Sequence, residues 1–514
     1  MREEFRLEPA QVPGAQFVDM PARLRAAAAA HPLEIAVIDG AARLRWGDFV
    51  DTIDRIAAEL AERGLRRGDV VASLAGVSAD HLLLYMGVLA AGACMAPLPV
   101  GAHPDALRAM LADSGAALVF ADAANRAVLA GLGAPADRLE ELRPAAARRA
   151  PAAPVSPAET DLFDIIYSSG TTGTPKGIQH DCRFRDRQMA RLSGYGFRPG
   201  AVSLVSTPLY SNTTLAALLP ALAYGGTVVL MRKFDARGFL ELAEAHRVTH
   251  AMLVPVQYRR LLAHPEFDRF ELSAFEVKLS TSAPLPEPVI RDALKRWPGR
   301  LVNIYGMTEG GVSVILDCTE HPDKLDTVGT PAAGGELRII DEEGRELPQG
   351  ETGEIVGRSG AIMVGYRNAP EKTREATWTS PEGHTFIRTG DMGRLDEDGF
   401  LTLLDRRKDM IISGGFNIFA ADLELVLCGH PEVHEAAVIG VPSERWGETP
   451  LALVVREPGA AVAAEELRDW ANARLGKLQR LSAVEFRDSL PRSDIGKVLK
   501  RELREPYLKQ AQEA

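Results

Sequence analysis

Large apolar residues near the start of the chain recur with helical spacing. From Trp46, the stretch WGDFVDTIDRIAAEL places them three or four positions apart, which predicts an amphipathic helix to about Leu60. The apolar run VVASLAG follows at residues 70–76, and another run, ALVFAD, is centred near Val119. Strands that alternate with helices pair in parallel, so this region predicts an α/β layer architecture.

The uncharged segment of residues 82–102, LLLYMGVLAAGACMAPLPVGA, is long enough to span a bilayer. It is rich in Ala and Gly, however, and Pro97 and Pro99 interrupt its last third. Because amphipathic segments flank it on both sides, it is predicted to be a buried helix running into a buried strand, not a membrane span. The acidic start of the chain, MREEFRLEP, does not have the pattern of a secretory signal.

Short apolar runs bounded by turn residues continue beyond residue 160. Four of them, SLVSTPLY, GGTVVLM, THAMLVPV and EVKLSTSAP, each predict a strand. The Pro/Ala-rich stretch of residues 143–160 has no periodicity and is predicted to be a surface connection. From about Gly335, shorter two-sided strands with Gly turns predict an antiparallel β subdomain.

A charged stretch, DRRKD at residues 405–409, precedes a last segment that has strands and helices of its own and is domain-sized. The expected fold class is multidomain α/β: a large N-terminal domain of α/β layers with a β subdomain, then a small α+β C-terminal domain. A chain of 514 residues is too long for one core, which agrees with this division. The apolar fraction of 46% and charged fraction of 25% are typical of globular proteins.

Charge and cysteine spacing exclude several classes of partner. The net charge is −11, and no Lys/Arg-rich run with interleaved aromatic residues is present, so nucleic acid is not an expected partner. The four cysteines stand far apart without CxxC spacing, which argues against a disulfide framework and a zinc site. They are Cys94, Cys182, Cys318 and Cys428. A reducing, cytoplasmic compartment is therefore expected.

The stretch YSSGTTGTPKG, residues 167–177, follows the apolar run DLFDIIYSS and has the composition of a phosphate-binding loop. Pro175 stands where a Walker A loop needs Gly, so the P-loop of a kinase or GTPase is excluded. Glycines let several backbone N–H groups point at one ligand, and Lys176 adds a charge. Such a loop would hold the β and γ phosphates of a nucleotide, although a plain turn is an equal alternative from this stretch alone. The residues concerned are Ser168, Ser169, Gly170, Thr171, Thr172, Gly173 and Thr174.

Further motifs carry complementary chemistry. In NIYGMTEGG, Tyr305 is suited to stack on a base, Thr308 to contact a phosphate and Glu309 to hold Mg²⁺. Asp391, in FIRTGDMGRLD, is a carboxylate suited to the two hydroxyls of a ribose. Taken singly, Tyr305 is more often a core residue, Glu309 a solvated charge and Asp391 a turn residue.

Two more motifs lie near the C-terminus. DRRKDMIISGGFN contains Arg406, a fixed cation, followed by Gly414 and Gly415, where a ligand or backbone has room to approach. LPRSDIGKVLKREL presents Lys497 on a Gly turn, where a lysine is by itself most often a surface residue. A serine hydrolase would need a GxSxG motif before a helix, and none is present.

Together and in this order, the Ser/Thr/Gly loop, YGMTE, TGD and PRSxxGK closely resemble the motifs of the adenylate-forming superfamily, which includes acyl-CoA synthetases, luciferases and adenylation domains. The resemblance covers roughly Phe17 to Leu503. It implies that a carboxylate attacks the α-phosphate of ATP to give acyl-AMP and pyrophosphate, and that the acyl group then passes to a nucleophile. Such chemistry needs charge stabilisation and positioning more than a covalent nucleophile.

The resemblance also implies roles for single residues. Lys497 would supply charge at the α-phosphate, and the Ser168–Lys176 loop with Mg²⁺ on Glu309 would neutralise pyrophosphate. Asp391 and Arg406 would hold the ribose. The adenine would lie between Tyr305 and a facing segment, with the backbone after Tyr305 alongside. The segment and this backbone are Ser282, Ala283, Pro284, Gly306 and Met307.

The family's domain organisation implies an N-terminal adenylation domain at residues 1–405 and a mobile C-terminal domain at residues 409–514. Between them, residues 406–408 would form a hinge centred on Lys408. Lys497 would face ATP in one orientation, and the GGFN face would replace it in the second half-reaction. The acceptor side would comprise Gly414, Gly415, Phe416, Asn417 and Trp446.

Two departures from the family pattern affect the substrates. Ser211, in TPLYSNTT, stands where many relatives have a His that guards the acyl pocket, and Ala420, in GGFNIFAADLE, stands where Pro is usual. The acyl pocket is expected around Tyr210, Ser211, Asn212, Gly310 and Gly311, where the glycines leave space, with Thr213 and Thr214 next to them. The acid itself does not follow from the sequence.

Three functions follow from the resemblance, in order of preference. The first is an acyl-CoA ligase, which uses CoA as acceptor. The second is an amide ligase of the coronafacic acid ligase type, which joins the acid to an amino acid. The third is a non-catalytic nucleotide-binding protein, which would be expected to lack Lys497, Glu309 or Asp391, although this chain has all three. The chain is expected to be a monomer or homodimer.

Overall fold

The computed structural model describes residues 7, 9–10, 16–168, 175–413, 416–476, 479–492 and 498–513. The chain divides into two compact units. The first comprises Met1–Leu337 and Val356–Ile387, and the second comprises Arg338–Ile355 and Arg388–Ala514.

A nine-stranded sheet of mixed direction forms much of the first unit, in the order β15-β14-β13-β12-β11-β9-β10-β1-β2. The strands from β1 to β13 along this order pair in parallel, as their alternation with helices predicts, whereas both edges are antiparallel. The strands are β1 (Ile35–Asp39), β2 (Ala42–Arg45), β9 (Val202–Val205), β10 (Thr227–Leu230), β11 (His250–Leu253), β12 (Val277–Ser280), β13 (Arg300–Gly306), β14 (Ser313–Asp317) and β15 (Thr330–Pro331).

A seven-stranded sheet, of order β18-β8-β7-β4-β3-β5-β6, also belongs to the first unit. Strands β7, β4, β3, β5 and β6 pair in parallel along this order. The pairs β7–β8 and β8–β18 are antiparallel. The strands are β3 (Val70–Leu74), β4 (Cys94–Pro97), β5 (Leu118–Ala121), β6 (Asp137–Arg138), β7 (Leu162–Ser168), β8 (Lys176–Asp181) and β18 (Gly365–Tyr366).

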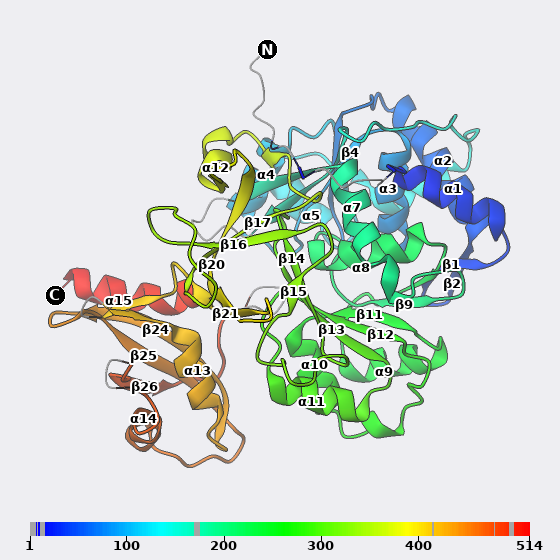
Figure 1. The fold of residues 1–514 in the computed structure, drawn as a ribbon. Helices are drawn as coiled ribbons and strands as arrows, with labels where there is room; N and C mark the ends of the chain where they lie inside the picture. Colours follow the sequence, from blue (N-terminus) through cyan, green and yellow to red (C-terminus); the bar gives the residue numbers. More distant parts are fainter. Residues whose placement is uncertain are drawn as a thin grey trace. The chain divides into compact units, whose positions relative to one another are not determined.

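Helices cover these sheets, and Figure 1 shows α9, α10 and α11 grouped beside β11, β12 and β13. The predicted helix from Trp46 is α2, and the buried face contains Phe49, Ile53, Ile56 and Leu60. Further helices are α1 (Met20–Ala30), α2 (Trp46–Glu62), α4 (Pro104–Ser114), α5 (Arg126–Gly131), α7 (Cys182–Arg191), α8 (Asn212–Ala223), α9 (Ala236–Ala245), α10 (Pro255–Leu262), α11 (Glu287–Arg296) and α12 (Pro370–Glu375), with short 3₁₀ turns at Ser193–Tyr195 and Phe267–Arg269.

The segment of residues 82–102 forms a buried helix, α3 (Ala79–Ala90), that leads into the buried strand β4, as predicted. Every residue of α3 except Asp80 is buried. Among the helices that the structure describes, none is long and apolar enough to cross a membrane.

The Pro/Ala-rich stretch of residues 143–160 was predicted to be a surface connection throughout, and this was wrong for its first four residues. They belong to α6 (Leu139–Ala146), which contacts α2 and α3. Leu139, Leu142 and Ala146 are buried and share one helix face, so packing outweighs the helix-breaking effect of Pro144. Residues 147–160 contain no helix or strand.

The predicted antiparallel strands after Gly335 are present. Strand β20 (Thr385–Leu395) pairs antiparallel with β19 (Thr377–Thr379) in its first half and with β21 (Leu401–Arg406) in its second. Strands β16 (Glu336–Ile340) and β17 (Gly353–Arg358) precede them.

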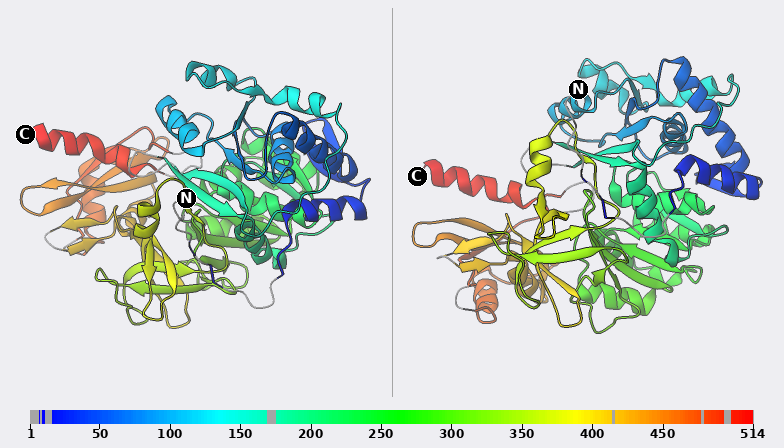
Figure 2. Two further views of the ribbon diagram at one scale, coloured as in Figure 1. Left: turned by 90° about the horizontal axis from the view of Figure 1, so that it is seen from above. Right: turned by 45° about the horizontal axis from the view of Figure 1, so that its top comes forward.

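The C-terminal part of the second unit has a sheet of its own, of order β23-β22-β25-β24 with β26 beside β25. Its core includes Leu423, Val438 and Leu467. Figure 2 shows α15, in red, alongside the long β24–β25 hairpin. The elements are β22 (Ile411–Ser413), β23 (Phe416–Ile418), α13 (Ala420–Cys428), β24 (Val433–Ser443), β25 (Gly447–Arg456), α14 (Ala464–Asn472), β26 (Ala483–Phe486) and α15 (Lys500–Glu513).

Candidate active site

The Ser/Thr/Gly loop connects two paired strands of the first unit. Ser168 ends β7 and Lys176 begins β8, and the two residues are partners in the antiparallel register. The loop thus starts at a strand end, as the sequence predicts, and returns to the adjacent strand at the same level. Ser169, Gly170, Thr171, Thr172, Gly173 and Thr174 lie outside the described residues.

Lys176 and Glu309 meet at the same aromatic side chain, Tyr366. The Lys176 ammonium lies 4.8 Å from the centre of the Tyr366 ring, and the Tyr366 hydroxyl donates to Glu309 Oε1 at 2.8 Å. Burial and the Glu309 carboxylate both raise the pKa of Tyr366, so it remains a hydrogen-bond donor. The two residues predicted to face the departing pyrophosphate are therefore neighbours, oriented by a tyrosine that sequence reasoning missed.

Glu309 fits the chemistry of a Mg²⁺ ligand. It is half-buried, and its Oε2 accepts no hydrogen bond from the part of the chain that the structure describes. Within the same residues, no group of three or more His, Cys, Asp or Glu side chains could hold a metal ion. Mg²⁺ commonly takes one or two carboxylates and completes its shell with substrate phosphates and water, so a single carboxylate suffices.

The YGMTEGG motif lies at the end of β13 and in the turn that follows. Tyr305, Met307 and Thr308 are half-buried, and Gly306 is exposed. Gly310 and Gly311 adopt left-handed φ values of +75° and +83°. A Cβ on Gly310 would lie 2.7 Å from the Phe184 ring, and a Cβ on Gly311 would lie 2.8 Å from the carbonyl oxygen of Gly357. Backbone conformation and close packing thus already require both glycines, apart from any space left for an acyl group.

A fully buried polar network connects this motif to the loop strands. Asp164, on β7, accepts a hydrogen bond from the Tyr85 hydroxyl at 2.7 Å and pairs with the Arg185 guanidinium. His180, on β8, has Nδ1 2.6 Å from Asp164 Oδ1 and Nε2 2.7 Å from the carbonyl oxygen of Thr308. Burial alone would raise the pKa of Asp164, but Arg185 and His180 lower it to about 2. Sequence reasoning missed these residues.

The predicted adenine segment and acyl pocket are joined by a hydrogen bond between two hydroxyls. Thr213 Oγ1 and Ser282 Oγ are 2.5 Å apart, and Ser282 has a left-handed φ of +79°. Ala283 is half-buried and Pro284 exposed. Ser282 is therefore held in a conformation that normally favours glycine.

Ser211, which replaces the usual His, caps a helix. Its Oγ accepts a hydrogen bond from the backbone N–H of Thr213 at the start of α8, at 3.3 Å. Tyr210 and Asn212 beside it are half-buried, and Asn212 Oδ1 accepts a hydrogen bond from Arg185 Nη1 at 2.6 Å. The buried network therefore extends to the predicted acyl pocket.

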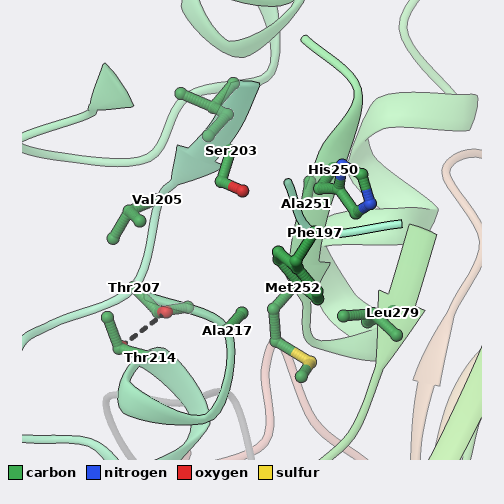
Figure 3. A pocket seen from close by; sticks show the side chains of 11 residues that line it. Phe197, Ser203, Val205, Thr207, Thr214, Ala217, His250, Ala251, Met252 and Leu279 are labelled. Atoms are coloured by element: carbon green, nitrogen blue, oxygen red, sulfur yellow. Dashed lines mark hydrogen bonds between the residues drawn. The ribbon is translucent and has the colours of Figure 1, made fainter. Parts of the chain in front are cut away.

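A small cavity lies next to these residues, between α8 and strands β9 and β11 (Figure 3). Thr207 and Thr214 flank it and hydrogen-bond to one another at 2.7 Å. Ser203, His250 and Met252 also line it. Its lining is largely apolar and includes Thr214, from the segment predicted to form the acyl pocket, but not Tyr210, Ser211, Asn212, Gly310 or Gly311.

In the second unit, the predicted ribose-binding residues face each other. Asp391 and Arg406 are partners in the register of β20 and β21, with Arg406 Nε 3.3 Å from Asp391 Oδ1. The backbone N–H of Asp391 donates to Thr389 Oγ1 at 3.1 Å, which fixes the strand locally. Lys408 is exposed in the turn after β21.

The predicted acceptor side is partly described. Phe416 on β23 is 52% exposed, and Trp446, at the tip of the β24–β25 hairpin, is 47% exposed. Gly414, Gly415 and the catalytic candidate Lys497 lie outside the described residues, and only the backbone of Asn417 is described. Ala420 is fully buried in the first turn of α13, so an apolar residue is needed where relatives have Pro.

Known proteins resemble the chain along most of its length. Residues 24–367 match the model of the AMP-binding enzymes, and residues 422–497 match the model of the AMP-binding enzyme C-terminal domain. A feruloyl-CoA synthase from Amycolatopsis sp is 34% identical over 486 residues, which are 93% of this chain and 96% of the relative.

Two solved structures have the same fold. ATP-bound MatB from Rhodopseudomonas palustris has a TM-score of 0.87 and 31% identity, covering 96% of this chain and 99% of that one. The amide bond synthetase McbA from Marinactinospora thermotolerans has a TM-score of 0.85 and 29% identity, covering 95% and 100%. The chain therefore belongs to the AMP-binding enzyme family, and it is an AMP-forming carboxylic acid ligase of the adenylate-forming superfamily.

Proposed function

We propose that this ligase makes an acyl-CoA thioester in two steps, which together consume one ATP. The observation that best supports the first step is the meeting of Lys176 and Glu309 at Tyr366, which places a cation beside a carboxylate suited to Mg²⁺. The similarity to feruloyl-CoA synthase over 93% of the chain supports CoA as acceptor.

In the first step, a carboxylate oxygen of the acid attacks the α-phosphorus of ATP. The bond from that phosphorus to the bridging oxygen breaks, and pyrophosphate leaves. Lys176 would neutralise charge on the departing group, and Lys497 would stabilise charge at the α-phosphate. Glu309, oriented by the Tyr366 hydroxyl, would hold Mg²⁺, which supplies further positive charge to the phosphates.

Two sets of residues would hold the nucleoside. Tyr305 would stack on adenine, with Ser282, Ala283 and Pro284 opposite and the Gly306–Met307 backbone alongside. Asp391 would accept hydrogen bonds from the two ribose hydroxyls, and Arg406, whose Nε lies 3.3 Å from Asp391 Oδ1, would orient it.

In the second step, the thiol sulfur of CoA attacks the acyl carbonyl, the thiol proton is lost and AMP leaves. We propose that the C-terminal domain rotates about residues 406–408. The face of residues 414–417, with Trp446 beside it, would then replace Lys497. Residues 1–405 would form the adenylation domain and residues 409–514 the mobile domain. The exposed Phe416 and Trp446 support this assignment, because each leaves apolar surface available to an acceptor.

Transfer to the amine of an amino acid is the second candidate. It is supported by the fold similarity to the amide bond synthetase McbA and by the departure at Ala420 on the acceptor side. The third candidate, a non-catalytic nucleotide-binding protein, has no comparable support.

A cytoplasmic location is proposed on the cysteine chemistry. Cys94, Cys182 and Cys318 are buried, and burial raises the pKa of each thiol, to about 12 at Cys318. Buried neutral thiols are suited to a reducing compartment. Small molecules are the proposed partners, and the protein would act as a monomer or homodimer.

Mass spectrometry of one reaction tests the acceptor. The mixture would contain ATP, Mg²⁺, aromatic and aliphatic acids, CoA and the common amino acids. Acyl-CoA products are expected. Acyl-amino acids formed without CoA would replace the thioester proposal with the amide one, and Lys497→Ala should give neither product because acyl-AMP would not form.

A further inference from the structure

Helix α7 carries four arginines, and three of them have a carboxylate partner. Arg183 lies 3.5 Å from Asp181 Oδ2, Arg185 lies 2.7 Å from Asp164 Oδ2 and Arg187 lies 3.0 Å from Asp186 Oδ2. The fourth is Arg191, the last residue of the helix.

Arg191 has no carboxylate within salt-bridge distance among the described residues. Its Nη1 donates to Ser313 Oγ on β14, and its Nε is enclosed with no hydrogen-bond partner in the described parts of the chain. Burial lowers the pKa of Arg191 to about 10, which still leaves the guanidinium charged at neutral pH. Arg191 is half-buried, and holding a cation there without a counter-ion costs free energy, so the position is better explained by a ligand than by stability.

The surroundings of Arg191 identify where such a ligand would lie. Phe184, Gln188 and Arg191 are spaced i, i+4 and i+7 and therefore share one face of α7. Phe184 packs against Gly310, and Gln188 Nε2 is 3.4 Å from Asn212 Oδ1.

Gly310 and Asn212 belong to the proposed acyl pocket, so this face of α7 borders it. Seven residues of α-helix span about 10 Å, so Arg191 lies roughly that far along the helix from the Phe184 end. The guanidinium thus stands at one end of a face that also presents an aromatic ring and an amide.

We infer that Arg191 and Ser313 bind a second carboxylate of the acid substrate, so that this ligase activates dicarboxylic acids. A guanidinium offers a planar fork of donors that matches a carboxylate, and the Ser313 hydroxyl adds one more. The reacting carboxylate attacks ATP, while the second one stays ionised and is not consumed. The inference rests on the proposed acid-activating function and its acyl pocket.

Matched pairs of acids test the inference. ATP-dependent pyrophosphate release would be measured with linear diacids from malonate to suberate and the corresponding monoacids, and with 4-carboxycinnamate and 4-methylcinnamate. The wild-type enzyme is expected to prefer a diacid. Arg191→Gln should lower kcat/KM for that diacid by about 30-fold, the effect of losing charged hydrogen bonds, and leave the matched monoacid within about threefold.

Arg187→Gln is the matched control, because it removes a paired arginine of the same helix. It should leave the diacid preference unchanged. Preference of the wild-type enzyme for monoacids, or equal losses on both acids in Arg191→Gln, would overturn the inference while leaving acid activation intact. If Arg191→Gln does not fold, Arg191→Lys should keep the preference at reduced kcat/KM, and an unchanged kcat/KM would count against recognition by the guanidinium fork.

Thermal melting separates this inference from the proposed function. If the wild-type enzyme released pyrophosphate with no acid at all, the proposed acyl chemistry would fail. Binding of a diacid without ATP should still raise the Tm of the wild-type protein and not that of Arg191→Gln. Equal shifts in the two proteins, or none, would refute the carboxylate site.

Discussion

The carboxylate of Asp164 accepts two hydrogen bonds from the guanidinium of Arg185, from Nε at 2.9 Å and from Nη2 at 2.8 Å. Both side chains are fully buried. A buried ion pair rarely contributes much to stability compared with apolar packing, but breaking it leaves an uncompensated charge. Its value here lies in its connections, since His180 and Asn212 extend it to Thr308 and to the proposed acyl pocket.

Asp164→Asn should lower the free energy of unfolding at pH 7 by about 3–5 kcal/mol, because Arg185 would be buried without a counter-ion. The effect should depend on pH. The pKa of Asp164 is lowered from 3.8 to about 2 on folding, so its ionised form stabilises the fold above about pH 4, and this contribution, about 2 kcal/mol, is lost as pH falls toward 2.

Urea denaturation of both proteins between pH 3 and pH 7 measures this, and the difference between them should shrink toward the acid end. A difference that stays constant with pH would mean that Asp164 is not held ionised by its partners. Asp186→Asn provides a control, because Asp186 is also buried but pairs with Arg23 and Arg187 away from the network.

Tyr366→Phe should slow adenylation by about tenfold, because Glu309 would lose the hydrogen bond from the Tyr366 hydroxyl and hydrogen bonds to charged groups contribute roughly 1.5–3 kcal/mol. The ring that contacts Lys176 is kept. The rate of pyrophosphate release should recover partly at high Mg²⁺, which distinguishes loss of metal orientation from general damage. Tyr507→Phe removes a comparable hydroxyl, 2.6 Å from Glu485, and should leave the rate unchanged.

These residues show where sequence interpretation succeeds and where it stops. The buried face of α2 follows from spacing within a dozen residues, and the burial of α3 follows from its uncharged apolar run. Paired runs such as β9 and β11 follow from local composition. Tyr366 and His180 could not be found in this way, because each acts through a partner far along the chain, His180 through Thr308 128 residues later. The sequence carries only an indirect signal for His180: a His and an Asp inside otherwise apolar strands must be paired if they are buried.

The helix α6 was missed for the opposite reason. Its Pro and Ala content is typical of a surface connection, and only the buried contacts of Leu139 and Leu142 stabilise it as a helix. Gly310 and Gly311 were predicted to leave space for an acyl group, but packing against Ala361 and Gly357 explains both glycines without a substrate.

Ser282 offers a test of stored backbone strain. Ser282→Gly should be close to neutral for stability, because glycine adopts the left-handed φ of +79° freely while the bond to Thr213 is lost. Ser282→Ala loses the same bond and keeps the strain, so it should be less stable than Ser282→Gly by about 1 kcal/mol. Chemical denaturation of the two variants gives the comparison directly, and equal stabilities would show that the position is unstrained.

Lys408→Pro probes the proposed change of orientation between the two steps. A proline fixes φ at the centre of the proposed hinge, so pyrophosphate release should be nearly unchanged while transfer to CoA slows by at least tenfold. Single-turnover measurements of acyl-AMP and acyl-CoA separate the two rates. Glu397→Pro, in another exposed turn of the second unit, controls for general effects of a new proline. Equal loss of both steps would argue against alternation about residues 406–408.

Asp391 should be the residue that recognises the ribose hydroxyls. In Asp391→Ala, kcat/KM for ATP should fall by about 100-fold, because a charged acceptor for two hydroxyls is lost. The fall should be much smaller with 2′-deoxy-ATP, since part of the interaction is already missing in the wild-type reaction. Asp391 and Arg406 are partners across β20 and β21, so Arg406→Gln should weaken the same discrimination less strongly. If Asp391→Ala lowered kcat/KM equally for ATP and 2′-deoxy-ATP, the carboxylate would be acting through the fold of the strand pair and not through contact with the sugar.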